Sequence, residues 1–138
     1  MTGEFALREH TADVAVEATG PDLGATFAAC ADGMVAAMCD SVPPDGERFD
    51  LAVRAESREA LLFDYLDRLL YETDVRGVLP VESEATVRAD GDEWVIEASA
   101  RGVPRDRVRA REVKAVTYSE MVVEETDEGW RAYVVLDV

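Results

Sequence analysis

A stripe of apolar residues at helical spacing between positions 58 and 70 is the feature that most restricts how this chain can fold. Its members recur three or four positions apart, as on the buried face of an α-helix; they are Leu61, Leu62, Tyr65, Leu66, Leu69 and Leu70. Ser57 precedes the stripe and can cap the helix N-terminus. A helix of this kind must bury its apolar face against another helix or a sheet.

A second amphipathic helix is predicted over residues 23–39, after a "TGPD" turn in which Asp22 is a suitable N-cap. Its apolar positions also follow helical spacing; they are Leu23, Phe27, Ala31, Met34, Val35 and Met38. Cys30 and Cys39 lie about 13 Å apart along this helix, which is too far for a disulfide. We therefore expect two free thiols.

The remaining segments favour β-strands. The dipeptide Asp90-Gly91 indicates a hairpin within residues 83–101, and a second hairpin is expected to turn near residues 127–129. Shorter strands are predicted at residues 4–8, 14–18 and 48–55. Together these elements predict an α+β, two-layer fold, with both helices packed on one face of a mainly antiparallel sheet. The length of 138 residues suits a single domain over residues 1–138.

The charge is strongly acidic, with 30 acidic and 14 basic residues and a net charge of −16. This balance, with a single lysine, is typical of a salt-adapted cytoplasmic protein whose self-repulsion is screened. It argues against non-specific binding of nucleic acid, which needs a basic surface. No long apolar run or signal-type N-terminus is present, so neither a membrane span nor secretion is expected.

One segment has the opposite charge: residues 101–114 carry six basic and two acidic side chains. Two interpretations remain open for the arginines from Arg101 to Arg111. They can balance an acidic neighbourhood within the protein, or they can form a docking patch for a phosphate, a nucleotide or an acidic partner.

Motifs of common enzymes are absent from the sequence. It contains no glycine-rich phosphate loop, CxxC pair, HExxH motif or serine elbow, and it has one histidine. We therefore expect a protein that is not an enzyme.

The histidine, His10, stands close to Asp13 in a segment that otherwise alternates like a strand. Strand alternation would place the two on opposite faces unless the backbone bends or bulges between them. At the other end of the chain, Asp137 is followed by Val138, which adds a carboxylate and a carbonyl. If the two ends were adjacent, their oxygens could hold a hard cation such as Ca²⁺; the alternative is solvated surface aspartates. Lys114, the single lysine, is either a chance residue at a strand edge or a functional ammonium.

Four ordered segments together resemble the archease family. They are "EHTADVAVEATGPDLGATFAACADGMVAAMCD", "EALLFDYLDRLLYETD", "EVKAVTYSEM" and the terminal "WRAYVVLDV". The resemblance runs nearly from end to end of the chain and implies an α+β protein that serves as a cofactor of the tRNA-splicing RNA ligase. Such a cofactor promotes guanylylation of the ligase and its repeated turnover, and it meets RNA only through the ligase.

The resemblance also assigns a site. It implies a divalent metal, with calcium expected and magnesium or manganese as alternatives, bound by Asp13, Asp137 and Val138. It implies that Lys114 is needed to activate the ligase. His10 is expected to support the site rather than to bind the metal.

Two departures from the family pattern qualify this assignment. Ser119 stands where archeases often have a histidine, and another such histidine is replaced by Val108 or a neighbour. Any role that needs those imidazoles is therefore in doubt here. The alternative functions are a general chaperone or adaptor without a dedicated metal site, and a metal-dependent hydrolase.

Overall fold

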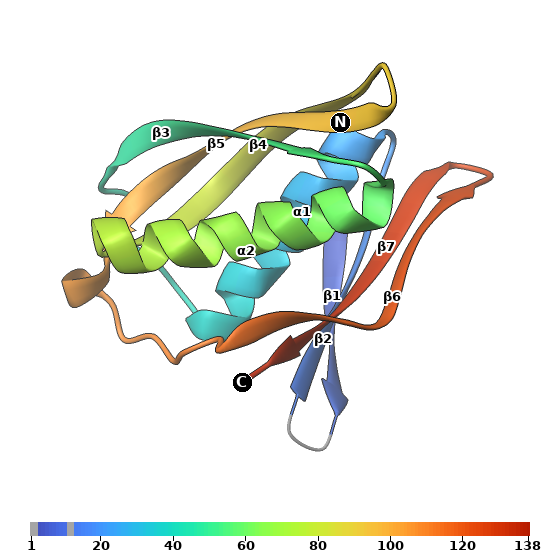
Figure 1. Cartoon of the computed structure of the whole chain (residues 1–138). Helices are drawn as coiled ribbons and strands as arrows, with labels where there is room; N and C mark the ends of the chain where they lie inside the picture. The colour runs from blue at the N-terminus through green and yellow to red at the C-terminus, as the bar shows by residue number, and fades with distance from the viewer. Residues whose placement is uncertain (1–2, 11–12) are drawn as a thin grey trace.

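The computed structural model describes residues 3–10 and 13–138 (Figure 1). Seven strands and two α-helices follow one another along this part of the chain. Their bounds are β1 Glu4–His10, β2 Asp13–Gly20, α1 Leu23–Met38, β3 Glu47–Ala55, α2 Arg58–Arg76, β4 Val78–Asp90, β5 Glu93–Pro104, β6 Ala115–Thr126 and β7 Gly129–Asp137, with a 3₁₀ turn η1 at Arg105–Arg107. No helix in the described ranges is long and apolar enough to cross a membrane.

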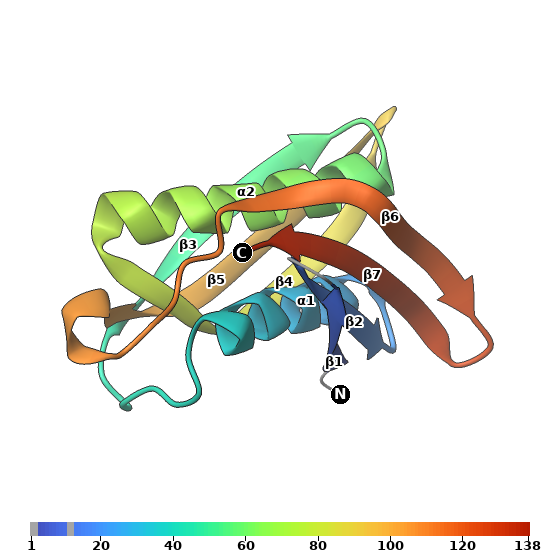
Figure 2. The ribbon, with the colours of Figure 1, turned by 90° about the horizontal axis from the view of Figure 1, so that it is seen from below.

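The strands form two antiparallel sheets with the helices between them (Figures 1 and 2). One sheet has the order β1-β2-β7-β6 and the other β3-β5-β4. Both helices contact strands of both sheets. The predicted α+β class, with two helices packed on antiparallel strands, is confirmed, and the strands are divided between two sheets where the pattern suggested one.

Helix α1 is buried on nearly all sides because it lies between β4 of one sheet and β2 of the other. Its N-cap is Asp22, as predicted, whose carboxylate accepts a hydrogen bond of 2.7 Å from the amide of Ala25. Gly24 permits the closest approach to β4, since a Cβ there would lie 2.3 Å from the carbonyl oxygen of Ala85. A helix covered on two sides is apolar around its whole circumference, and this explains its many alanines.

Helix α2 keeps one solvent-exposed face. Ser57 caps it as predicted, accepting from the amide of Ala60 at 3.0 Å, and Gly77 ends it in the left-handed conformation at φ 66°. Its apolar stripe is buried, with Leu61, Leu66 and Leu69 fully inaccessible. The helix packs on the β3-β5-β4 sheet, and β6 runs along its flank.

Both predicted hairpins are confirmed: β4 and β5 turn at Gly91, and β6 and β7 turn just before Gly129. At the N-terminus, the chain reverses between β1 and β2, so these strands also form an antiparallel hairpin. This reversal replaces the bend or bulge within one strand that the alternation pattern suggested. Cys30 and Cys39 are free thiols, as predicted.

Candidate functional site

One row across the β1-β2-β7-β6 sheet contains most of the residues that the sequence singled out. His10 is paired in register with Asp13, Asp13 with Asp137, and Asp137 with Ala115. Figure 2 shows β7 lying between β2 and β6. Antiparallel pairing therefore brings together three segments that are far apart in the sequence.

The carboxylates of Asp13 and Asp137 are direct cross-strand neighbours, and such neighbours project from the same face of a sheet. Both residues are half-buried. Among the side chains that the structure describes, no lysine or arginine forms an ion pair with either carboxylate. Like charges in this position repel, so the pair is an arrangement that a cation would stabilise.

Oxygen donors in this row are of the kind that hard divalent cations prefer. Val138 directly follows Asp137 and is also half-buried, which places its main-chain oxygens at the same end of β7. No cluster of three or more His, Cys, Asp or Glu side chains suited to a metal occurs among the described residues. Two aspartates alone would leave a hard cation short of the roughly six to eight oxygen ligands it usually takes, and main-chain oxygens are of the kind that could add to them.

Lys114 adjoins the same row. Its amide donates a hydrogen bond of 2.8 Å to the carbonyl oxygen of Asp137, which anchors the residue just before β6 begins. Its side chain is exposed and makes no ion pair in the described structure. A cavity of about 90 Å³ lies beside it, lined among others by Leu70, Thr73 and Asp74 of α2. No spacing in the sequence connects these α2 residues to Lys114: Leu70 was predicted only as part of the apolar stripe, and Thr73 and Asp74 were not singled out.

Two further residues that the sequence singled out are His10 and Ser119. The side chain of His10 lies outside the described residues, so its supporting role stays a prediction. Ser119 is exposed within the irregular part of β6, where the register with β7 shifts between Thr117 and Val122.

The arginines of the basic segment mostly bind the protein itself. Arg101 forms a two-point ion pair with Glu82, at 3.0 and 3.1 Å, and lowers the pKa of that carboxyl. Arg101 also donates to main-chain oxygens of Pro43 and Asp45. Arg111 donates to the carbonyl of Ala37.

The other three arginines of this segment are Arg105, Arg107 and Arg109. Arg105 lies 3.9 Å from Asp74, and Arg107 pairs with Asp45. Of the five arginines, Arg109 alone has neither an ion pair nor a side-chain hydrogen bond to a described residue. The balancing interpretation therefore fits Arg101, Arg105, Arg107 and Arg111, and a docking patch of all five arginines is not supported.

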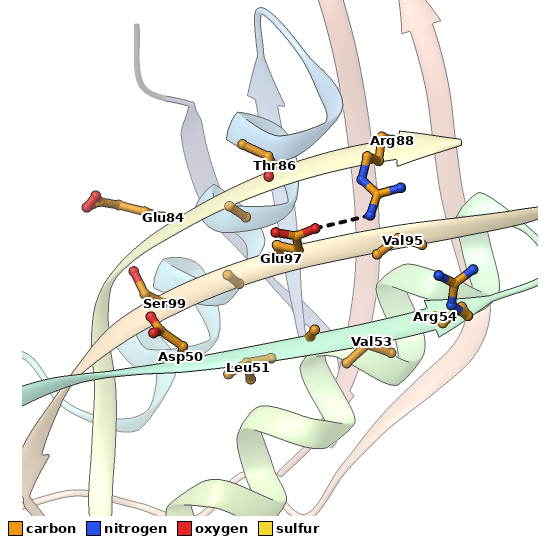
Figure 3. A pocket seen from close by; sticks show the side chains of 13 residues that line it. Asp50, Leu51, Val53, Arg54, Glu84, Thr86, Arg88, Val95, Glu97 and Ser99 are labelled. Atoms are coloured by element: carbon orange, nitrogen blue, oxygen red, sulfur yellow. Dashed lines mark hydrogen bonds and ion pairs between the residues drawn. The ribbon is translucent and has the colours of Figure 1, made fainter. Parts of the chain in front are cut away.

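A shallow hollow of about 980 Å³ lies over the outer face of the β3-β5-β4 sheet, across the helices from the end of β7 (Figures 1 and 3). Several of its charged side chains are ion-paired: Arg88 is 3.2 Å from Glu97, and Arg54 is 2.9 Å from Asp90, which lies outside the lining. No histidine or cysteine lines it.

The chain is similar along nearly its whole length to members of one protein family. The model of the Archease protein family (MTH1598/TM1083) matches residues 5–138. Protein archease of Methanosarcina acetivorans is 33% identical over 98% of this chain and 96% of its own length. Protein archease of Thermococcus gammatolerans is 33% identical over 94% of this chain and 95% of its own length.

Solved structures agree in fold. The solution structure of Methanobacterium thermoautotrophicum protein 1598 matches with a TM-score of 0.78 and 32% identity, covering 99% of this chain and 98% of that chain. The crystal structure of an archease, possible chaperone, from Thermotoga maritima matches with a TM-score of 0.64 and 23% identity, over 95% of this chain and 94% of that chain. The family match over nearly the whole chain and the full-length likeness to these relatives show that the chain belongs to the archease family.

Proposed function

We propose that this protein activates the GTP-dependent tRNA-splicing RNA ligase, promoting its guanylylation and repeated turnover, and is not itself an enzyme. The observation that carries the proposal is the row in which Asp13 and Asp137 oppose each other and Lys114 is hydrogen-bonded to Asp137. The residues that the family resemblance assigns to metal binding and activation thus adjoin one another, although they come from three distant segments.

In this proposal the row forms a tip that enters the active site of the ligase. Asp13, Asp137 and a main-chain oxygen of Val138 hold a divalent cation, calcium in the first instance and magnesium or manganese as alternatives. The bound cation supplies positive charge where nucleotide phosphate is handled. The two carboxylates hold that charge in place, because both are fixed on neighbouring strands.

Lys114 acts beside them as a compact ammonium, a group suited to neutralising a phosphate oxygen. Its main chain is tied to β7 while its side chain is exposed, so the ammonium can reach a partner without loosening the sheet. RNA is met only through the ligase, since a net charge of −16 repels phosphate. We place the protein in the cytoplasm, where a salt-adapted, acidic surface remains soluble.

A general chaperone or adaptor is the alternative, and the Thermotoga relative is described as a possible chaperone. One comparison separates the two functions. Limiting cognate ligase is assayed with and without this protein in high salt, and an unrelated aggregating client is assayed in parallel. The proposal predicts more guanylylation and more turnovers of the ligase with no protection of the client. Protection of the client without stimulation of the ligase would favour the chaperone.

A further inference from the structure

The outer face of α2 exposes large apolar side chains that no other element covers. Five such residues are exposed in the described part of the chain, and three of them gather here: Tyr71 at 59%, Val75 at 62% and Tyr118 of β6 at 54%. The other two, Phe5 and Leu7, lie on β1. Single exposed apolar residues are ordinary, whereas a group of them indicates a binding surface.

These residues lie along one side of α2 and on the strand beside it. Asp64, Asp67, Tyr71 and Val75 recur at helical spacing and share one side of α2, over about 16 Å of its axis. Tyr118 extends this group onto β6, because its ring stacks on Phe63 with the ring centroids 4.3 Å apart. We refer to Asp64, Asp67, Tyr71, Val75 and Tyr118 as the α2–β6 face.

The acids of this face are not neutralised. Neither Asp64 nor Asp67 forms an ion pair with any described residue. Burial and the neighbouring charge of Asp67 raise the pKa of Asp64. Burial, Asp64 and Glu56 likewise raise the pKa of Tyr118. Negative charge therefore accumulates beside exposed rings and is paired with no lysine or arginine among the described side chains.

This combination selects one kind of occupant. Arginine and lysine side chains pair with carboxylates and also pack over tyrosine rings. RNA would be repelled by the acids. A second copy of this chain, related by a two-fold axis, would bring the same acids together at a net charge of −16 per chain.

The α2–β6 face and the cavity beside Lys114 both include residues of α2. The cavity that adjoins Lys114 is lined by Leu70, Thr73 and Asp74, on the same half of α2 as Tyr71 and Val75. The Tyr71–Val75 end of the α2–β6 face therefore lies at the same end of α2 as the cavity beside Lys114.

We infer that the α2–β6 face is the surface on which this protein docks a basic, arginine- or lysine-bearing patch of its protein partner. This inference rests on the proposed function, which identifies the partner as the RNA ligase. Docking through α2 and β6 holds the activating tip against the ligase, so affinity and activation reside in neighbouring but separate residues.

The test measures the affinity of the cognate ligase for the full-length protein at low and at high salt. The double variant Tyr71→Ser/Val75→Ser should bind at least about tenfold more weakly. The double variant Asp64→Asn/Asp67→Asn should bind more weakly at low salt and show a smaller dependence on salt. Leu7→Ser and Asp127→Asn are the matched controls, since they remove an exposed apolar side chain or an exposed charge elsewhere, and both should bind like the wild type.

Additional measurements distinguish a failure of the α2–β6 face from a failure of the proposed function. Asp13→Ala should bind the ligase normally while failing to stimulate it. Wild-type affinity in both double variants, with their melting temperatures unchanged, would overturn the α2–β6 face alone. A wild-type protein that neither binds nor stimulates the ligase would overturn both. A dimer of this chain that Tyr71→Ser dissociates, or RNA binding that it abolishes, would assign the face to another occupant and overturn the inference.

Discussion

The direct opposition of Asp13 and Asp137 predicts that one substitution changes stability in opposite directions with and without metal. In chelator, Asp13→Asn removes a like-charge contact and should stabilise the protein. In saturating Ca²⁺, the same substitution removes a ligand and should leave the variant less stable than the wild type. We expect the order of the two melting temperatures to reverse.

The magnitudes follow from the pairing. Side chains directly opposed on antiparallel strands have Cβ atoms about 5 Å apart, where two like charges near water repel by roughly 1 kcal/mol. For a chain of this length, that corresponds to about 3 °C in melting temperature. A cation present at a hundredfold excess over its dissociation constant stabilises the folded state by about 2.7 kcal/mol. The stability that the wild type gains from bound metal should therefore exceed the stability that Asp13→Asn gains in chelator.

Thermal unfolding followed by circular dichroism, at one fixed pH with chelator or with Ca²⁺, is the appropriate assay. Asp127→Asn is the control: it removes one exposed carboxylate at the β6–β7 turn, far from the pair, and should not respond to Ca²⁺. The reasoning is refuted if Asp13→Asn destabilises the protein in chelator. It is equally refuted if the variant gains as much stability from metal as the wild type.

Three further predictions concern other parts of the structure. Thiol reagents should modify Cys39 in the native protein and reach Cys30 only on unfolding, because burial raises the pKa of Cys30 to about 12; equal labelling rates would contradict this. Asp64→Asn should raise the free energy of unfolding by about 0.3 kcal/mol at neutral pH, since it removes a like-charge contact on α2. The raised pKa of Asp64 means that its charge disfavours folding as pH rises through that pKa. The stability gained by Asp64→Asn should therefore vanish in acid, where the wild-type carboxyl is already neutral. Urea unfolding at neutral and at acid pH measures the difference. Arg101→Ala should destabilise by about 2 kcal/mol through its lost hydrogen bonds to main-chain carbonyls, whereas Arg109→Ala should change urea unfolding little; similar effects of both would contradict the self-binding role of Arg101.

Local chemistry was the predictable part of the fold. The N-caps at Asp22 and Ser57 and the turn at Asp90-Gly91 depend on neighbouring residues alone, so sequence spacing identified them. The division into two sheets depends on which strands pair across the chain. Helical periodicity showed that α1 buries an apolar face, but it could not show that strands cover α1 on two sides.

In the candidate site too, some features could be predicted from the sequence and others depend on strand pairing. Asp13, Asp137 and Lys114 were singled out by residue type and by family resemblance, and their adjacency comes from the pairing of β2, β7 and β6. The pairing of Arg101 with Glu82 could not be predicted, because it depends on an irregularity of β4 that turns the backbone of Glu82 to φ 50°. Charge composition alone therefore left internal balancing and a docking patch both open, and the structure shows internal ion pairs for Arg101, Arg105 and Arg107.

The central claim is that this protein activates the ligase through the row formed by Asp13, Asp137 and Lys114. The most direct measurement is guanylylation and turnover number of limiting ligase on its RNA substrate, in high salt, with wild type, Asp13→Ala and Lys114→Ala. Asp127→Ala and Arg109→Ala serve as controls for the lost carboxylate and the lost cation. The account predicts that the wild type and both controls stimulate, while the two row variants, folded and still able to bind the ligase, do not. Full stimulation by Asp13→Ala and Lys114→Ala would contradict it.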